Sequence, residues 1–537
     1  MNKRCHFFVV ILALLSFGYG YSYDFKDERF AYNFTNDGNV AITYLSQEAD
    51  ANSQYAKGEV TIPESVKIND VTYRVTEIGE SAFHDCTDIT TVKLTNNIVY
   101  ICDYAFQGCT SLSKLVIPTS VSKIYQYALV GCTGLKEFVV EDSSEDIDFS
   151  NLTSPNDALF KECPLETVYL GRKYLYFGST RPLGGITTLK NLTIGSMIDE
   201  IYPYAFKDCT ALENVVLGNQ ITAIGKEAFM NCSALQHISF PESLESIGSG
   251  AFYKSGLKEL VLPGNVKKVD SGCFNKCTAL TKLIVEDSET TLNMYVDDFK
   301  YVETLYLGRN LCGQYAYVNH FPALKYAEIG PNVTTINNYL FSGSSLLQLI
   351  EVKDDANSTK MLTHSQSDVN KLVLTNSITE IGGSAFSNCT GLTEITLPEN
   401  LSSIGGSAFS KCENIQVVKS LNSCPPTLGS NVYNVVTIQN AVLQVPEDAI
   451  STYSQAEGWN FSNIIGLSGV NAITETTNQD FVISDGAIIL NQGVKSACLY
   501  SVSGQRIPLP TSNVISGLHK GLYILVVDGI SHKVAIK

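Results

Sequence analysis

The sequence has few of the residues that enzymes and nucleic-acid-binding proteins gather in their sites. It holds one Trp, seven His that never cluster, and 37 Lys and Arg against 54 Asp and Glu, for a formal net charge of -17. Nucleic acids and anionic membranes need clustered basic side chains, so this balance argues against both as partners. The motifs HExxH, GxSxG and GxxxxGK are also missing. The sequence therefore predicts no enzyme, no cofactor and no metal site.

Long apolar runs are missing too, except at the N-terminus. Residues Phe7–Phe17 form an apolar stretch that follows Lys3 and Arg4 and precedes two glycines. This order predicts a signal peptide over residues 1–22. No later stretch reaches the ~18 apolar residues that a membrane helix needs. We expect an exported protein that does not insert into a membrane once the signal is removed.

A motif of 23 residues recurs along the middle of the chain. Phe229 and Phe252 lie 23 residues apart in matching surroundings, and Cys86, Cys109 and Cys132 keep the same spacing. A fixed period in the twenties is typical of a solenoid, in which each coil buries its apolar side against its neighbours. We therefore predict a solenoid over residues 76–466. Its further units centre on Phe160, Phe206, Phe229, Phe252, Phe274, Phe341, Phe386 and Phe409.

Each unit holds two apolar stretches. Apolar residues alternate in Leu392–Pro398 until the proline, and Leu401–Gly405 leads through glycine into the Ala-Phe segment. Alternation predicts strands, and proline cannot donate to a ladder. We expect coils of strand, turn, short strand and Phe-bearing turn. At a spacing of ~4.8 Å, about fifteen coils make a rod on the order of 70 Å long.

Segments without the repeat flank this array. Residues 23–75 alternate like strands and are predicted to cap the first coil, because an open solenoid end would aggregate. Residues 421–466 form a different, terminal unit in which Trp459 seals the last coil. A polar linker over 467–480 precedes residues 481–537, whose alternation predicts a small β-sandwich.

Two irregular modules, at about 141–195 and 286–330, interrupt the regular coils and carry Tyr-rich loops. Insertions in a solenoid map to loops on one face, often the binding face, and Tyr supplies large amphipathic area at low entropic cost. Packing inside a larger coil explains these tyrosines equally well. The phrases shared by the modules are Val140–Ser143 with Val285–Ser288, and Val168–Arg172 with Leu305–Arg309. The candidate ligand contacts are Tyr174, Tyr176, Phe177, Tyr315 and Tyr317.

Fifteen cysteines in an exported chain suggest disulfides, but their positions favour free thiols. Side chains in equivalent slots stack at ~4.8 Å with parallel Cβ vectors, whereas a disulfide needs facing Cβ atoms ~3.8 Å apart. Ser255 and Ser344 occupy the same slot in other units, as expected for a small buried group. The slot cysteines are Cys86, Cys109, Cys132, Cys163, Cys209, Cys232, Cys277, Cys389 and Cys412.

The repeat motif Ile-Gly-x-x-Ala-Phe-x-x-Cys-x-x-Leu-x-x-Ile-x-Leu-Pro resembles the BspA-like (Treponema pallidum type) leucine-rich repeat of bacterial surface proteins. It is clearest in Ile224–Pro241 and Ile381–Pro398, and the resemblance covers roughly residues 24–466. Less specifically, Leu499–Gln505 and Gly517–Tyr523 resemble the C-terminal sorting or anchoring sandwiches of Bacteroidetes secreted proteins.

The resemblance implies a mainly β, right-handed leucine-rich repeat solenoid at the cell surface, outside the outer membrane. It further implies adhesion to host extracellular proteins or to other bacteria, without catalytic residues. We expect a monomer that binds such an extracellular protein. Two alternatives stay open: a glycan-binding module, for which the sequence offers Tyr and hardly any Trp, and a structural stalk without a ligand. The fold does not fix the ligand.

Overall fold

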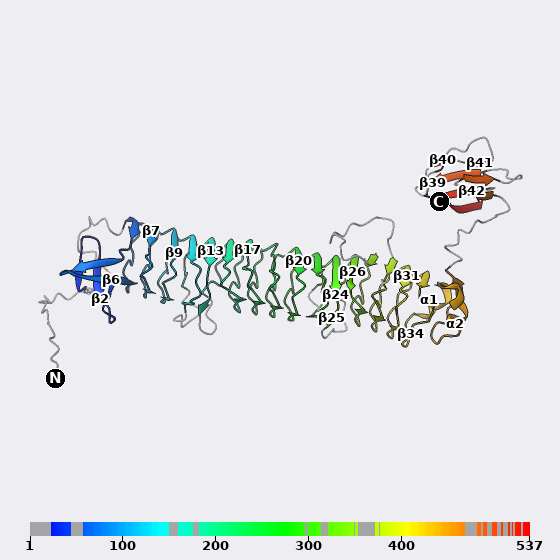
Figure 1. The fold of residues 1–537 in the computed structure, drawn as a ribbon, viewed down its shortest axis with the longest axis horizontal. Helices are drawn as coiled ribbons and strands as arrows, with labels where there is room; N and C mark the ends of the chain where they lie inside the picture. The colour runs from blue at the N-terminus through cyan, green and yellow to red at the C-terminus, as the bar shows by residue number, and fades with distance from the viewer. Residues whose placement is uncertain are drawn as a thin grey trace.

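The computed structural model describes residues 23–43, 57–149, 159–175, 182–295, 299–312, 320–347, 349–352, 371–374 and 376–467, and parts of 481–536. The repeats form a long rod in which about fifteen coils of roughly 23 residues stack side by side (Figure 1). Each coil has a strand on one side, a short strand on the other, and a turn that joins them. The predicted mainly β solenoid is confirmed.

Except at 237–240, the first apolar stretch of the described units forms a strand of a parallel sheet, called here the long sheet. Phe138 pairs with Leu115 on one side and with Val168 on the other, and all three are fully buried. Alternate residues face outward, as the period of a strand requires. Its strands are β4 (Gly58–Thr61), β7 (Ile89–Lys93), β9 (Lys114–Ile117), β11 (Glu137–Val140), β13 (Thr167–Leu170), β15 (Asn191–Ile194), β17 (Asn214–Val216), β20 (Glu259–Leu262), β22 (Lys282–Val285), β24 (Thr304–Arg309), β26 (Tyr326–Asn332), β28 (Leu349–Val352), β29 (Lys371–Val373), β31 (Glu394–Leu397), β33 (Val417–Ser420), β35 (Val442–Val445) and β36 (Asn463–Gly466).

The second apolar stretch forms short strands on the opposite side of the rod, called the short sheet (Figure 1). Pairing in this sheet stops after β14 and again after β25, so both interruptions fall in the irregular modules. Its strands are β8 (Tyr100–Ile101), β10 (Lys123–Ile124), β12 (Ile147–Asp148), β14 (Tyr174–Leu175), β16 (Glu200–Ile201), β18 (Ala223–Ile224), β19 (Ser246–Ile247), β21 (Lys268–Val269), β23 (Leu292–Met294), β25 (Leu311–Cys312), β27 (Thr335–Ile336), β30 (Glu380–Ile381), β32 (Ser403–Ile404) and β34 (Thr427–Leu428).

The Phe-bearing turns stack their rings along the rod. Phe83 lies on Phe106 with 5.3 Å between ring centroids and an interplanar angle of 4°. The stack also includes Phe299 and Phe321, whose centroids are 6.0 Å apart, and Phe274 lies 5.9 Å from Phe299. The repeat motif does not predict these two rings, because neither follows an alanine nor precedes a slot cysteine. Packing, and not the local motif, therefore defines the coils of the second irregular module.

Cysteine suits its slot because the thiol reaches back to the preceding coil. Sγ of Cys132 lies 3.0 Å from the carbonyl oxygen of Phe106, and Oγ of Ser344 donates in the same way to Phe321 O at 3.0 Å. A small donor is needed there, which explains why Ser replaces Cys. All fourteen described cysteines are free, in agreement with the predicted thiols, and Cys86 alone of the nine slot cysteines is partly exposed.

The long sheet is interrupted midway, since residues 237–240 pair with neither β17 nor β20. Phe240 fills a core position that Ile194 and Leu262 occupy in nearby coils, where they are at most 2 % exposed. The larger Phe240 ring packs edge-on against Phe252, with centroids 5.7 Å apart, and is itself only partly buried. Overpacking a close-packed core displaces backbone. We attribute the interruption to this ring.

On the other two sides of the rod, the same coils keep their hydrogen bonds to one another. In the short sheet Ile224 still pairs with Ile247. On the turn side the Phe229 amide donates to Ala251 O at 2.7 Å. The interruption is therefore confined to the long sheet, where it leaves Val215, Leu217 and Ile238 partly exposed.

The N-terminal cap consists of β1 (Phe25–Lys26), β2 (Ala31–Phe34), β3 (Val40–Thr43), β5 (Ser65–Ile68) and β6 (Val71–Ile78). β3 pairs with β6 and β6 with β8, so the cap continues the short sheet. The sequence analysis also placed residues 58–61 in the cap. Instead β4 pairs with β7, so the long sheet begins there, before residue 76. Its Val60 is buried as in a regular coil.

The C-terminal end of the rod adds α1 (Val435–Asn440), the 3-10 turn η3 (Glu447–Ala449) and α2 (Ile450–Gln455). Tyr433 extends the ring stack, 5.5 Å from Phe409. Trp459 is 1 % exposed and donates its indole N–H to Pro426 O at 3.0 Å. The last coil is thus closed by aromatic rings, including the predicted Trp459.

Residues 481–536 form two small antiparallel sheets around Ile488, Leu499 and Leu525, which are fully buried. The predicted linker lies almost wholly outside the described residues. No helix in the described part of the chain is long and apolar enough to cross a membrane. The strands are β37 (Phe481–Ser484), β38 (Ala487–Leu490), β39 (Ala497–Ser501), β40 (Arg506–Ile507), β41 (Val514–Ile515), β42 (Gly521–Val527) and β43 (Ile530–Ile536).

Candidate functional site

Of the five candidate ligand contacts, only Tyr174 lies within the described residues; Tyr176, Phe177, Tyr315 and Tyr317 lie outside them. Tyr174 sits on β14 and is 5 % exposed. Its ring centroid is 5.6 Å from that of Phe149 and 5.3 Å from that of Tyr202. Tyr174 therefore offers almost no surface to a ligand, and its ring packs inside the coil.

Each irregular module buries an arginine that reaches back to an earlier coil. Arg172 is 1 % exposed and donates from Nη1 to Thr119 O and from Nη2 to Pro118 O, both at 2.9 Å. Arg309 is fully buried and donates to Val266 O at 2.9 Å and to Pro263 O at 2.7 Å. Each guanidinium thus satisfies carbonyl groups at the proline turn of that coil.

Burial lowers the pKa of both guanidinium groups, while Glu141 opposes this for Arg172 and Glu286 for Arg309. The sequence analysis did not single out these arginines, although Gly-Arg ends a phrase shared by the modules. Their partners are backbone carbonyls of the same chain, so their role is structural.

A tyrosine and an aspartate form a hydrogen-bonded pair at the corner of each module. Tyr169 donates to Asp142 at 2.8 Å, and Tyr306 donates to Asp287 Oδ1 at 2.6 Å. Burial, reinforced by the aspartate, raises the pKa of both phenols. The backbone N of Asp287 lies 2.6 Å from where a Cβ on Gly308 would stand. Glycine is therefore required at this corner, where regular coils have proline.

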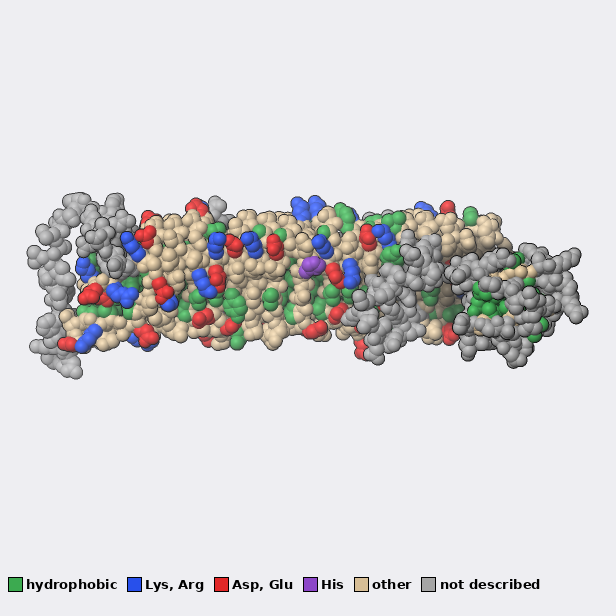
Figure 2. Space-filling model, turned by 90° about the horizontal axis from the view of Figure 1, so that it is seen from above, with side chains coloured by type: hydrophobic (Ala, Val, Ile, Leu, Met, Phe, Trp, Pro, Cys, Tyr) green, Lys and Arg blue, Asp and Glu red, His purple; other side chains and the backbone are tan. Residues whose placement is uncertain are grey.

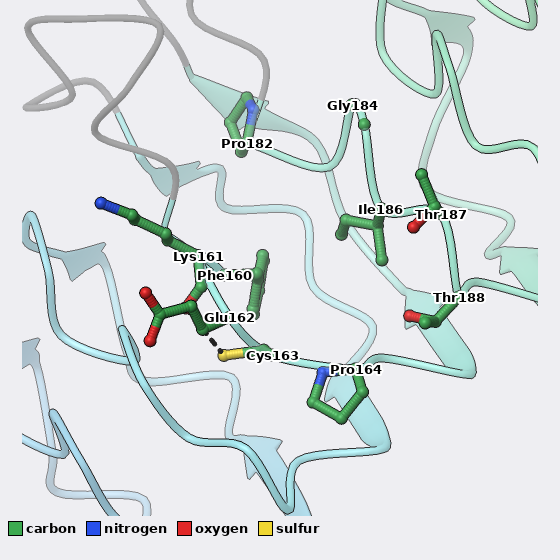
Figure 3. A pocket seen from close by; sticks show the side chains of 11 residues that line it. Phe160, Lys161, Glu162, Cys163, Pro164, Pro182, Gly184, Ile186, Thr187 and Thr188 are labelled. Atoms are coloured by element: carbon green, nitrogen blue, oxygen red, sulfur yellow. Dashed lines mark hydrogen bonds between the residues drawn. The ribbon is translucent and has the colours of Figure 1, made fainter.

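A pocket of about 370 Å³ opens beside the first irregular module, between the turns 160–164 and 182–188 (Figure 3). Lys161 and Glu162 lie on one wall, and Ile186 lies on the other. The thiol of Cys163 is 2.9 Å from Leu129 O, and its contact with Cys132, together with burial, raises its pKa. A thiol protonated in this way is not a nucleophile. The pocket has the size of a small-ligand site but supplies no activated group.

The outward face of the long sheet carries charged pairs beside apolar side chains (Figure 2). Lys114 and Glu137 on neighbouring strands are 2.6 Å apart, and two residues further along the same strands Val116 lies next to Val139. On the strands that precede the second module, Lys282 pairs with Glu259 at 2.7 Å. Half-exposed ion pairs of this kind contribute about 0–1 kcal/mol each to stability. They therefore stabilise the rod little, and their main effect is the charge that they place on this face.

On this face, outward-facing apolar residues of neighbouring strands form a column beside each module. Each column ends at the tyrosine of a Tyr–Asp pair. Val139 is the neighbour of Tyr169, and Ile284 is the neighbour of Tyr306. The first strip, Val116 with Val139 and Tyr169, is half-exposed, whereas Ile284 and Tyr306 are 6 % and 7 % exposed. The first strip is therefore the better candidate for a contact surface.

The fold and these surfaces can be set beside known proteins. Residues 61–181, 183–305, 311–436 and 359–492 match the family described as BspA type leucine rich repeat region. No curated protein matches the chain.

Among solved structures, a leucine-rich repeat protein from Bacteroides ovatus is 20% identical, with 83% of this chain and 100% of that chain covered and a TM-score of 0.40. A leucine rich cell surface protein from Faecalibacterium prausnitzii is 18% identical, with 82% and 94% covered and a TM-score of 0.28. The T. pallidum leucine rich repeat protein is 20% identical, with 49% and 85% covered and a TM-score of 0.17. Because the family matches span well over half of the sequence, the chain belongs to the BspA type leucine-rich repeat family.

Proposed function

We propose that the chain is a secreted or cell-surface protein that binds an extracellular protein, on a host matrix or on another bacterium, through the long sheet. Leucine-rich repeat proteins are typically surface proteins that mediate protein binding, and the solenoid is a typical non-enzymatic scaffold. The apolar N-terminal stretch of the sequence supports export. The C-terminal sheets would then serve sorting or anchoring.

One observation carries this proposal: an apolar strip runs beside a row of charged pairs on the same face. Val116, Val139 and Tyr169 form the strip, and Lys114 pairs with Glu137 beside it. Protein interfaces combine an apolar centre that contains aromatic residues with a polar rim. Enzymatic chemistry has no comparable support, because the described pocket holds no activated group.

The test is a binding screen of the full secreted chain against extracellular matrix proteins, mucins and a glycan array. Val139→Glu places a charge at the centre of the strip and should weaken protein binding about tenfold, as loss of a hot-spot contact does. Thr210→Glu is the matched control, since Thr210 is exposed on the turn side of the rod. Binding to glycans alone would support the glycan alternative, and silence on every surface would support a stalk.

A further inference from the structure

Four tyrosines of two neighbouring coils form two pairs of contacting rings near the N-terminal end of the rod. The ring centroids of Tyr100 and Tyr125 are 6.3 Å apart at an interplanar angle of 77°. Those of Tyr104 and Tyr127 are 5.2 Å apart and nearly parallel, at 10°. Tyr100 is 37% exposed, and the other three are half-buried. We call these four residues the tyrosine edge.

The turn that holds Tyr104 and Tyr127 has the same backbone in the other coils. Tyr104 and Tyr127 have φ of 58° and 59°, and Gly250 and Ser384 have φ of 65° and 55° at the equivalent position. The repeat therefore sets this backbone and accepts residues of different size there. The two tyrosines are not required by the fold, so their paired rings are a property of these two coils.

Carboxylates border the tyrosine edge, where Lys123 is the one cation that acts on Asp103 and is itself paired with Asp148. Glu77 pairs with Tyr100 across β6 and β8, and Glu80 and Asp103 lie in the turns that follow these strands. None of the three carboxylates forms an ion pair with a described residue. Burial, then the neighbouring Glu80, raises the pKa of Asp103, and burial, then Asp37, raises that of Glu77. The local field is therefore negative.

The protein already holds one ammonium group by the same means. Lys123 Nζ lies 4.9 Å from the ring centroid of Tyr125 and 2.8 Å from Asp148 Oδ2. A cation is thus placed over a tyrosine ring and against a carboxylate within the chain itself. Both contacts favour a cation, the ring through its quadrupole and the carboxylate through its charge.

We propose that the tyrosine edge, together with Glu77, Glu80 and Asp103, binds the Lys or Arg side chains of a basic segment in an extracellular protein partner. The rings accept the cationic heads, and the bordering carboxylates neutralise their charge. The charge complementarity extends to the whole chain, whose formal net charge is -17. This inference rests on the proposed protein-binding function and adds the chemistry of the partner.

The test measures binding of a fluorescent Lys/Gly peptide, and of its Glu/Gly counterpart, to the full secreted chain. Tyr104→Ser with Tyr127→Ser removes two rings and introduces a residue that other coils use at this position. Each ring should be worth about 2- to 5-fold in affinity for the lysine peptide. Tyr339→Ser is the control, because Tyr339 has the same backbone, with φ of 61°, in a distant coil.

A second variant, Glu77→Gln with Asp103→Asn, should weaken binding of the lysine peptide and reduce its salt dependence. The proposal is overturned if the edge variants bind as wild type, if Tyr339→Ser loses as much affinity as they do, or if the edge takes glycans and not the lysine peptide. Matrix proteins could still bind the variants of the tyrosine edge and fail to bind Val139→Glu. That result would support the proposed function and refute this inference alone.

Discussion

Replacing Phe240 by leucine should close the interrupted long sheet and stabilise the rod. Leucine fits the core position that Leu262 fills in the next coil, where it is fully buried. Closure would restore about three backbone hydrogen bonds between 237–240 and the flanking strands, at ~1 kcal/mol each. The substitution removes the edge-on contact with Phe252, which contributes about 1 kcal/mol. The free energy of unfolding should therefore rise by about 2 kcal/mol.

Hydrogen exchange and chemical denaturation test this together. In the wild type the amides of 238–240 should exchange faster than those of 260–262, and Phe240→Leu should slow them to a similar rate. The matched control is Phe229→Leu, which removes a ring from the continuous stack, 5.3 Å from Phe252, and should cost roughly 1–2 kcal/mol. The same substitution, Phe to Leu, should therefore raise the free energy of unfolding at position 240 and lower it at position 229. If Phe240→Leu destabilises the rod or leaves 238–240 unprotected, overpacking is not the cause of the interruption.

Four further predictions concern the core and its charges. Cys132→Ala should cost about 1–2 kcal/mol in chemical denaturation because Phe106 O loses the thiol and keeps only the Cys109 amide as a donor, whereas Cys132→Ser should cost less than about 1 kcal/mol; equal costs would contradict the donor role. Arg309→Met should cost about 2–4 kcal/mol, since buried carbonyls lose their donors, and Lys93→Met on the surface should change stability little. Iodoacetamide at about pH 8 should modify the exposed Cys312 and Cys424 in the native protein but not Cys412, whose pKa burial raises to about 12; labelling of Cys412 at a similar rate, read by mass spectrometry, would refute this. The pKa of Asp103 is raised on folding, so its contribution to stability is present at acidic pH and is lost as the pH rises from the unfolded pKa of about 3.9 through the raised folded pKa. Asp103→Asn should therefore raise Tm at neutral pH. An unchanged Tm would count against the crowding of carboxylates there.

The sequence by itself determined the period, and the period determined the architecture. The spacing between Phe229 and Phe252 repeats one supersecondary unit, and such a unit can bury its apolar side only by stacking on a copy of itself. The slot of Cys132 was readable for the same reason, since Ser255 marks it as small and buried. Residues 58–61, expected in the cap, pair with β7 in the long sheet.

Only the tertiary structure decided what happens where the repeat is imperfect. Tyr174 turns into the core, Arg172 reaches the carbonyl groups of Pro118 and Thr119, and the long sheet is interrupted between β17 and β20. Each of these depends on which side chains of a neighbouring coil stand opposite, and the repeat motif does not specify them. Tyr104 and Tyr127 lie 23 residues apart, so the period places their rings in neighbouring coils, but only the structure places Glu77 beside Tyr100. The local repeat pattern determines the fold of each coil, and the contacts between coils determine which side chains lie on the surface.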